Sequence, residues 1–161
     1  MDPNTLISKI MARDLITFRP DEDIWEVMQR MVKNKISGGP VINERGELIG
    51  MLSEADCIRV ILEDHGDQPG GNGTVADYMS HDVTTVEANN TLVEVASYFT
   101  HKNFRRFPVC DSGRLVGQIS RSDVLKAVSQ LKHKIHLVPD SWKHRMPVES
   151  PSKRGYYSEN A

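Results

Sequence analysis

The sequence is short of the features that mark several classes of protein. It has only two cysteines, Cys57 and Cys110, with no CxxC pair, and aromatic residues make up 6% of its 161 positions. No apolar run approaches the roughly 20 residues that a membrane helix needs. Residues 1–11 lack the basic and apolar segments of a signal peptide. These absences disfavour a disulfide scaffold and a membrane span, and they favour buried free thiols in a reducing cytoplasm.

The sequence also lacks a marked excess of positive or negative charge. The chain carries 20 basic and 22 acidic residues, for a net charge of −2, so little in it attracts nucleic acid or an anionic membrane. The six histidines are scattered, and the two in residues 133–136 have no evident third ligand for a metal. No nucleophile stands beside a base. We therefore expect no enzyme, no metal site and no required cofactor.

What the sequence does contain is an internal repeat. "ELIGMLSEADCI" at 47–58 and "RLVGQISRSDVL" at 114–125 share a Gly-x-x-Ser-x-x-Asp spacing. The matched residues are Gly50 with Gly117, Ser53 with Ser120, and Asp56 with Asp123. The match extends over residues 5–63 and 74–131, so the chain is a tandem duplication.

Each copy predicts the order strand, helix, strand, strand, helix. The first strand of each copy is expected at 15–18 and at 83–86. The helix that follows has one apolar face in each copy, made by Ile24, Val27, Met28 and Met31 and by Leu92, Val95, Ala96 and Phe99. Thr91 and Glu94 have the spacing of a capping box, and Gly46 and Gly113 suit a positive φ in the turns between strands. We predict a first repeat within 1–68, a connector at about 64–73, a second repeat at 74–131, and an irregular or disordered arm at 132–161. A unit of about 60 residues buries little surface alone, so the copies should pack as an α/β pair with two equivalent clefts.

The Ser-x-x-Asp corner has two interpretations. As a capping box, the serine accepts from a helix N–H and the aspartate reaches back to the serine backbone. As a binding corner, the helix N-terminus attracts an anion and the aspartate accepts hydrogen bonds from a ribose diol. In the second interpretation, Gly50 and Gly117 let a ligand approach the backbone.

The two copies differ most just before the second strand. The first reads "ISGGPV", with Ser37 and Gly38, where the second reads "FRRFPV", with Arg105 and Arg106. The arginines are either ordinary surface charge or forked donors for a phosphate group. Arg121 stands inside the second corner where the first copy has Glu54.

The repeat resembles the CBS domain, and the tandem resembles a Bateman module. The matching pieces are "IM" and "YM", "PVI" and "PVC", "GELIG" and "GRLVG", and the closing S-x-x-D, in the same order twice. The resemblance implies an α/β (α+β) fold of two βαββα repeats in a disc-like, pseudo-twofold pair. It also implies clefts between the repeats that bind AMP, ADP, ATP, S-adenosylmethionine or NAD.

The resemblance further implies roles for particular residues. Asp56 and Asp123 would hold ribose hydroxyls, with Ser53 and Ser120 close by. The residues lining the base would be Thr17, Thr84, Thr85, Ile36, Pro40, Phe104 and Pro108. Arg105 and Arg106 stand where the gamma subunit of AMP-activated protein kinase carries a phosphate-contacting pair. The cleft of the first repeat is then empty, takes a ligand without phosphate, or is served by these arginines from across the twofold axis.

Three functions remain open at this point. The leading one is an adenosyl-ligand sensor that controls a partner protein or its own oligomer, expected to be a homodimer in the cytoplasm. The alternative is a structural or interaction homodimer with clefts that bind nothing. The third, nucleic-acid binding through the arm, is disfavoured because its basic residues are sparse and interspersed with acids.

Overall fold

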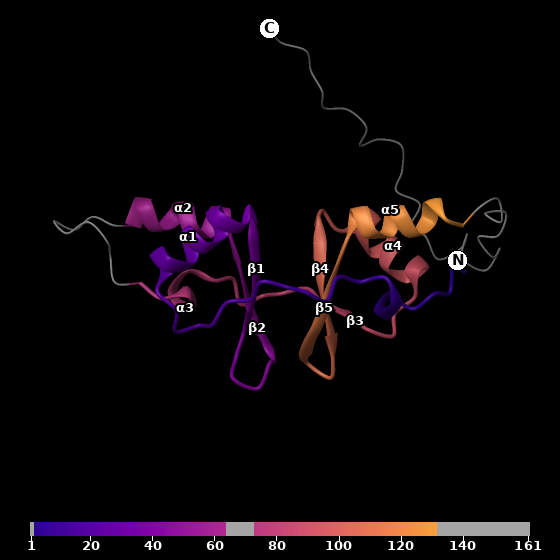
Figure 1. Cartoon of the computed structure of the whole chain (residues 1–161), viewed down its shortest axis with the longest axis horizontal. Coiled ribbons are helices and arrows are strands. Elements are labelled where there is room, and N and C mark those ends of the chain that lie inside the picture. The colour runs from indigo at the N-terminus through magenta and orange to yellow at the C-terminus, as the bar shows by residue number, and fades with distance from the viewer. Residues whose placement is uncertain (1, 64–72, 132–161) are drawn as a thin grey trace, which may run out of the picture. The chain divides into compact units, whose positions relative to one another are not determined.

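The computed structural model describes residues 2–63 and 73–131, so the arm expected at 132–161 lies outside the described residues. Figure 1 shows the elements in place. In chain order they are the 3-10 helix η1 (Ile7–Lys9), α1 (Ile24–Asn34), β1 (Gly38–Ile42), β2 (Leu48–Ser53), α2 (Glu54–Glu63), α3 (Val75–Tyr78), β3 (Val86–Glu87), α4 (Leu92–His101), β4 (Arg106–Asp111), β5 (Arg114–Ser120) and α5 (Arg121–Ser129).

Each repeat builds a small sheet beside two helices. β1 pairs antiparallel with β2, β4 pairs antiparallel with β5, and β3 runs parallel to β4. Gly46 and Gly113 lie in the hairpin turns with φ angles of 77° and 80°, the left-handed conformation that the sequence predicts there. The mixed α/β fold of two similar repeats is confirmed.

The first strand of each repeat is shorter than predicted. In the second repeat only Val86–Glu87 forms a strand, and in the first repeat Phe18 makes a single parallel bridge to Val41. The difference between the copies has a local cause. The N–H of Ala88 donates to the Cys110 carbonyl at 2.9 Å, whereas its counterpart Pro20 has no N–H to donate, so the ladder stops.

The amphipathic helices begin and pack as predicted. The Asp23 side chain accepts from the first turn of α1, and Thr91 and Glu94 form the expected capping box of α4. Met28 and Ala96, predicted on the apolar faces, are only partly buried. The buried residues of these faces are Ile24, Val27 and Met31 in α1 and Leu92, Val95 and Phe99 in α4. Burying each such side chain contributes about 1.5–3 kcal/mol.

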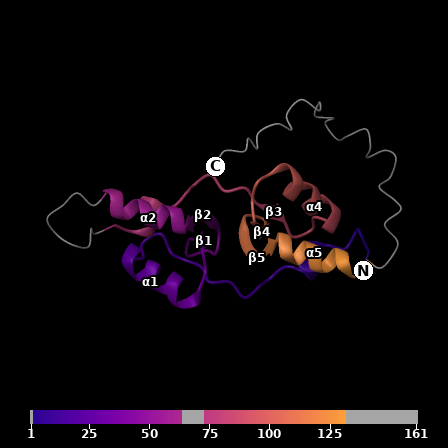
Figure 2. The same cartoon turned by 90° about the horizontal axis from the view of Figure 1, so that it is seen from above.

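The first residues of each repeat pack on the other repeat. Ala12 exchanges two backbone hydrogen bonds with Gln118, both 2.9 Å long. Ser80 exchanges two with Met51, at 2.9 and 3.0 Å. Figure 2 shows the N-terminal trace starting beside α5 before it reaches the first repeat. The unit that repeats in sequence therefore differs from the unit that packs in space.

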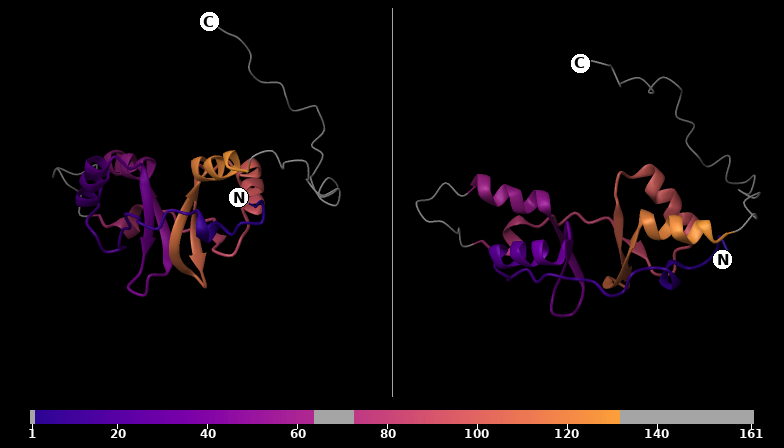
Figure 3. Two further views of the ribbon diagram at one scale, coloured as in Figure 1. Left: turned by 45° about the vertical axis from the view of Figure 1, so that its right-hand side comes forward. Right: turned by 45° about the horizontal axis from the view of Figure 1, so that its top comes forward.

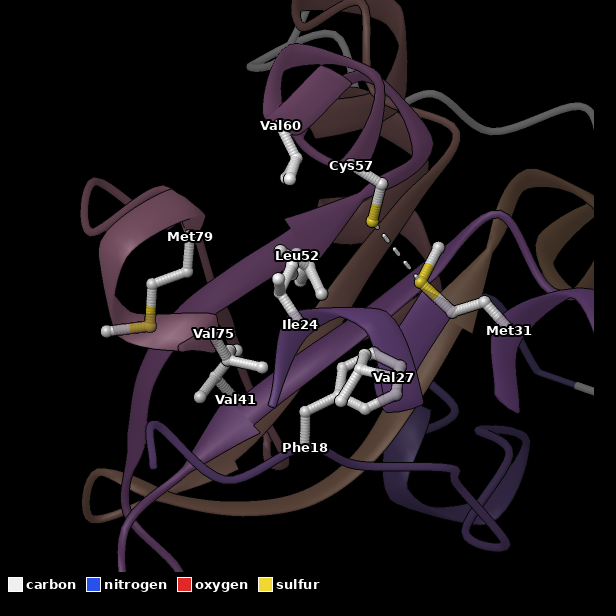
Figure 4. Close-up of a cluster of buried hydrophobic side chains, with 10 residues drawn as sticks. All are labelled: Phe18, Ile24, Val27, Met31, Val41, Leu52, Cys57, Val60, Val75 and Met79. Carbon is white, nitrogen blue, oxygen red and sulfur yellow. Dashed lines mark hydrogen bonds between the residues drawn. The ribbon is translucent and has the colours of Figure 1, made fainter. Parts of the chain in front are cut away.

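The core of the first repeat includes side chains from this exchanged segment. Figure 4 shows Val75 and Met79 among the buried residues of α1, β1, β2 and α2. Val75 is fully buried beside Val41 and Leu52, which are fully buried as well. The first repeat thus completes its core with residues that the sequence assigns to the second.

The tips of the two hairpins meet each other. The Leu48 N–H donates to the Gly113 carbonyl at 3.2 Å, and the Leu115 N–H donates to the Gly46 carbonyl at 3.0 Å. The two bonds are equivalent in the repeat alignment, so the twofold axis expected from the duplication passes between them. Figure 3 shows the hairpins side by side in two further views.

Both cysteines are buried and unpaired, as predicted. Burial raises the pKa of the Cys57 thiol, and the nearby carboxylates of Asp56 and Glu54 raise it further. Burial, followed by the charge of Glu87, raises the pKa of Cys110. Both side chains are therefore protonated thiols at neutral pH.

Among the helices that the structure describes, none has the length and apolar character to cross a membrane.

Candidate functional site

A cleft of about 330 Å³ opens around Asp56, and we call it the Asp56 cleft. Its lining comes from both repeats. The first repeat contributes Ser37, Gly38, Met51, Leu52, Ser53 and Asp56. The second contributes Ser80, Asp82, Val83, Thr84, Phe104, Arg105, Arg106 and Pro108. The cleft therefore brings seven of the predicted site residues together: Ser53, Asp56, Thr84, Phe104, Arg105, Arg106 and Pro108.

The Ser53–Asp56 corner is a capping box that uses one carboxylate oxygen. Oδ2 of Asp56 accepts from the Ser53 N–H at 2.9 Å and from its hydroxyl at 2.6 Å, and the Asp56 N–H donates to the Ser53 oxygen at 3.3 Å. The other oxygen, Oδ1, lies 3.8 Å from Nη2 of Arg59. The cap thus fixes the carboxylate and leaves Oδ1 with one distant charged neighbour among the described residues.

The Ser120–Asp123 corner has the same geometry. Oδ2 of Asp123 accepts from the Ser120 N–H at 2.9 Å and from its hydroxyl at 2.6 Å. The capping interpretation is therefore confirmed in both copies. Because the cap is complete in both copies, it does not indicate which of the two corners binds a ligand.

Gly38 explains why the first repeat has no basic pair. Its φ is 146°, and a Cβ at this position would lie 2.3 Å from the Leu52 carbonyl oxygen. Gly38 pairs with Ser53, at the end of the strand that leads into the corner. An arginine here would require the backbone to move, whereas its counterpart Arg106 lies in an ordinary strand.

The two arginines lie on the same cleft as Asp56. Arg106 donates from Nη2 to the Ser37 hydroxyl of the first repeat at 3.4 Å. Arg105 is exposed, and both side chains line the Asp56 cleft. Both arginines therefore lie on the Asp56 side of the twofold axis, the placement that one of the alternatives left open by the sequence requires.

One wall of the cleft is apolar. The ring of Phe104 is 43% exposed and packs edge-on against Phe107, with centroids 5.5 Å apart. Pro108 and Val83 complete this wall. A flat aromatic group could lie against it without displacing a polar side chain.

The remaining predicted residues lie outside the Asp56 cleft. Thr85 lines a separate groove, and Ile36 lines a groove between α1 and α2. Arg121 donates to the Lys102 carbonyl at 3.4 Å. The predicted residues absent from the lining of the Asp56 cleft are Thr17, Ile36, Pro40, Thr85, Ser120, Arg121 and Asp123.

The lining residues that were not predicted as site residues are Ser37, Gly38, Met51, Leu52, Ser80, Asp82 and Val83. Ser80 and Asp82 reach the cleft because the start of the second repeat packs on the first. The only sequence signal for this placement is the alignment of "YMSHD" with "IMARD", which shows equivalence and not exchange.

Gly50 and Gly117 were expected to let a ligand approach the backbone, but the structure gives a different reason for glycine at these positions. A Cβ on Gly50 would lie 2.6 Å from Sδ of Met79, and one on Gly117 would lie 2.6 Å from Sδ of Met11. These glycines make room for a methionine of the exchanged segment.

Within the described residues, no group of three or more His, Cys, Asp or Glu side chains has a metal-binding arrangement.

Known proteins are similar to this chain in sequence and in fold. Uncharacterized protein MJ1225 of Methanocaldococcus jannaschii is 32% identical over 123 residues, which cover 76% of this chain and 42% of the relative. Its crystal structure superposes with a TM-score of 0.69 at 28% identity, over 80% of this chain and 49% of that one. The chain therefore spans less than half the length of MJ1225.

Two solved structures match over nearly their whole length. CBSX2 from Arabidopsis thaliana, crystallised in complex with AMP, superposes with a TM-score of 0.68 at 25% identity, over 79% of this chain and 98% of that one. The CBS domain pair of MJ0100, in complex with 5'-methylthioadenosine and S-adenosyl-L-methionine, has a TM-score of 0.65 at 24% identity, over 81% and 100%. The second likeness shows the fold alone.

The family itself is matched twice along the chain. Residues 7–63 and residues 75–130 each match the CBS domain. These ranges coincide with the two copies of the duplication. The chain belongs to the CBS domain family and carries a tandem pair of these domains.

Proposed function

We propose that this protein is a regulatory module that binds an adenosine phosphate of the AMP type in the Asp56 cleft. One observation carries the proposal. A capped aspartate of the first repeat and two arginines of the second line the same cleft. A ribose diol and a phosphate group of one small ligand require these two kinds of partner.

Each part of the ligand has a matching partner. Oδ1 of Asp56 accepts from the ribose hydroxyls, while Oδ2 stays in the cap. The guanidinium groups of Arg105 and Arg106 donate to the phosphate, for which their planar, forked geometry is suited. The base lies against the apolar wall of Phe104 and Pro108.

The cleft around Asp123 is expected to behave differently. The residues equivalent to the basic pair are Ser37 and Gly38 there, so a phosphate has no matching donor pair. We propose that a phosphorylated ligand binds once per chain, and that the Asp123 corner binds no phosphate. This asymmetry follows from the backbone at Gly38, whose conformation would be strained for any residue with a side chain.

A relative supports the ligand class. CBSX2 was crystallised with AMP, and this chain covers 98% of that structure. By this proposal, binding draws the two repeats together across the cleft and shifts an equilibrium between two arrangements. The module performs no reaction of its own and controls a partner or its own oligomer. A cytoplasmic location remains a prediction that rests on the two unpaired thiols.

A calorimetric titration with AMP, ADP, ATP, S-adenosylmethionine and NADH in turn tests the proposal. Saturable binding of AMP at one equivalent per chain is expected. Two equal sites would contradict the asymmetry. No heat from any member of the panel, with folded protein, would overturn the sensor and favour the interaction module.

The interaction alternative has an observation of its own. Val32, Ile58, Leu62 and Leu125 are at least 60% exposed on helices α1, α2 and α5. Apolar side chains at these positions suit a homodimer through the helices. Sedimentation of the full chain, with and without AMP, distinguishes the cases: a dimer that ignores every ligand in the panel supports the alternative.

A further inference from the structure

The second repeat has a groove that the proposed function does not use. It lies between α4 and residues 84–87, encloses about 600 Å³ and is lined in part by Tyr98, so we call it the Tyr98 groove. It shares one lining residue, Thr84, with the Asp56 cleft.

The first repeat shows what fills the equivalent place. There Arg30 of α1 lies over the ring of Phe18, with its guanidinium carbon 5.0 Å from the ring centroid. Nη2 of Arg30 donates to the Thr17 carbonyl at 3.4 Å and also contacts the Glu22 carboxylate. The first repeat therefore holds a guanidinium between a ring, a backbone carbonyl and a carboxylate.

The second repeat keeps this place and lacks the guanidinium. In the repeat alignment Arg30 corresponds to Tyr98, a side chain with no positive charge. The other counterparts are Thr85 for Thr17, Val86 for Phe18 and Asn90 for Glu22, and all of them line the groove.

An aromatic residue is present in both places, although it comes from different positions of the repeat. In the first repeat Gly39 leaves room for the Phe18 ring, since a Cβ there would lie 2.9 Å from Cε2 of Phe18. In the second repeat Phe107 stands at the position of Gly39 and borders the groove, but it is only 1% exposed because it packs against Phe99 and Phe104. Tyr98, which is 43% exposed, therefore offers the ring surface for a cation, the role that Phe18 has for Arg30.

Charged groups of both signs complete the groove. Glu87 replaces Arg19 of the first repeat and adds a carboxylate on the β3 side. Lys102 and His101 line the groove from the C-terminal end of α4. The carboxylate of Glu87 and the ring of Tyr98 suit the cationic end of a ligand, and the Lys102 ammonium suits a carboxylate end.

We propose that the Tyr98 groove binds a small guanidino amino acid, with free arginine as the type, in the place that Arg30 occupies in the first repeat. The guanidinium lies by Tyr98, Asn90 and Glu87, and the carboxylate lies toward Lys102. This inference does not rest on nucleotide binding, because the groove is built within the second repeat.

Amide NMR spectra of the full chain, recorded without nucleotide, test it by titration with L-arginine. Saturable shifts are expected at residues 84–90 and 97–102, with smaller shifts for L-citrulline, which lacks the charge. Agmatine, which lacks the carboxylate, should bind more weakly than arginine. Equal shifts for arginine and citrulline, or shifts scattered over both repeats, would overturn the proposal.

The chain also offers a variant that supplies the occupant itself. Tyr98→Arg combined with Asn90→Glu rebuilds the ion pair of the first repeat at unchanged net charge, and it should abolish the arginine shifts. If this variant is poorly folded, Glu87→Gln, at an exposed position, serves instead. We expect it to weaken arginine binding by about fivefold, the size of a partly exposed ion pair. Unchanged affinity in a folded variant would contradict the site.

Discussion

At the scale of single residues, Asp56 and Asp123 separate the structural role of the corner from the binding role. Both carboxylates close a capping box through Oδ2 with nearly identical distances. Only Asp56 lines the cleft that contains Arg105 and Arg106. The two aspartates therefore form a matched pair in which the cap is constant and the surroundings differ.

Replacing each aspartate by alanine separates the two roles. Asp56→Ala and Asp123→Ala should each lower the free energy of unfolding by about 1 kcal/mol, because each removes half of a capping box. Asp56→Ala alone should weaken AMP binding, by about tenfold or more, since a charged hydrogen-bond acceptor is lost. Urea unfolding and calorimetry measure the two effects. Equal losses of AMP affinity in both variants would show that Asp123 binds the same ligand.

The arginine pair gives a second comparison at this scale. Arg105→Ala with Arg106→Ala should weaken AMP binding by about tenfold or more and leave adenosine binding nearly unchanged, because only AMP carries the group that a guanidinium recognises. Calorimetry with both ligands measures the difference. A similar loss for adenosine would mean that the pair shapes the cleft without contacting phosphate.

At the scale of elements, local sequence predicted the helices better than the strands. The caps of α2, α4 and α5 and the apolar faces depend on residues a few positions apart, so the sequence reveals them. The strand expected at 15–18 depends on a distant partner and on the missing N–H of Pro20. The sequence also could not reveal which repeat each starting segment packs on. Met11 and Met79 align with each other, so the two segments carry the same signal.

Met79→Ala tests the exchange of these segments. Met79 is 8% exposed in the core of the first repeat, so its truncation should cost about 2–4 kcal/mol of stability. The loss of protection in hydrogen exchange should appear at α1 and β2 of the first repeat. Val32→Ala, at a position 79% exposed, is the control and should change little. Protection lost in the second repeat alone would contradict the exchange.

The cap of α4 predicts a dependence on pH. Hydrogen bonds from the Thr91 backbone, and then from its side chain and from Asn90, hold the pKa of Glu94 below its usual value of 4.5 against the opposing effect of burial. A lowered pKa means stability that is present above about pH 4.5 and lost as the pH falls through the folded-state value. Glu94→Gln keeps a capping side chain but cannot titrate. Its Tm should fall less than that of the unmodified protein between pH 5 and 3; parallel curves would contradict this.

At the scale of the whole molecule, the Asp56 cleft exists only because two repeats meet. The duplication, the paired fold and seven of the predicted lining residues follow from the repeat pattern and the family resemblance. The other lining residues required knowledge of contacts between distant segments, such as Ser80 with Met51. The repeat pattern in the sequence identifies residues at equivalent positions of the two copies. The Asp56 cleft instead combines different positions of the two copies, such as Asp56 and Arg105.

A ligand held by both repeats should stabilise the whole unit. We expect AMP at 100 times its Kd to raise the free energy of unfolding by about 2.7 kcal/mol. A thermal melt should remain a single transition that shifts as one. Two transitions, with only one shifted by AMP, would show that the ligand contacts a single repeat.

The exchanged starting segments also bear on ancestry. A single repeat made alone would present Gly50 or Gly117 with no methionine to cover it, and its own starting segment would have no surface to bind. A single-repeat ancestor could satisfy both needs by trading that segment with a second copy of itself. On this view the duplication joined two swapped copies into one polypeptide, and the two halves then diverged, with arginines on one side and a glycine-only conformation on the other.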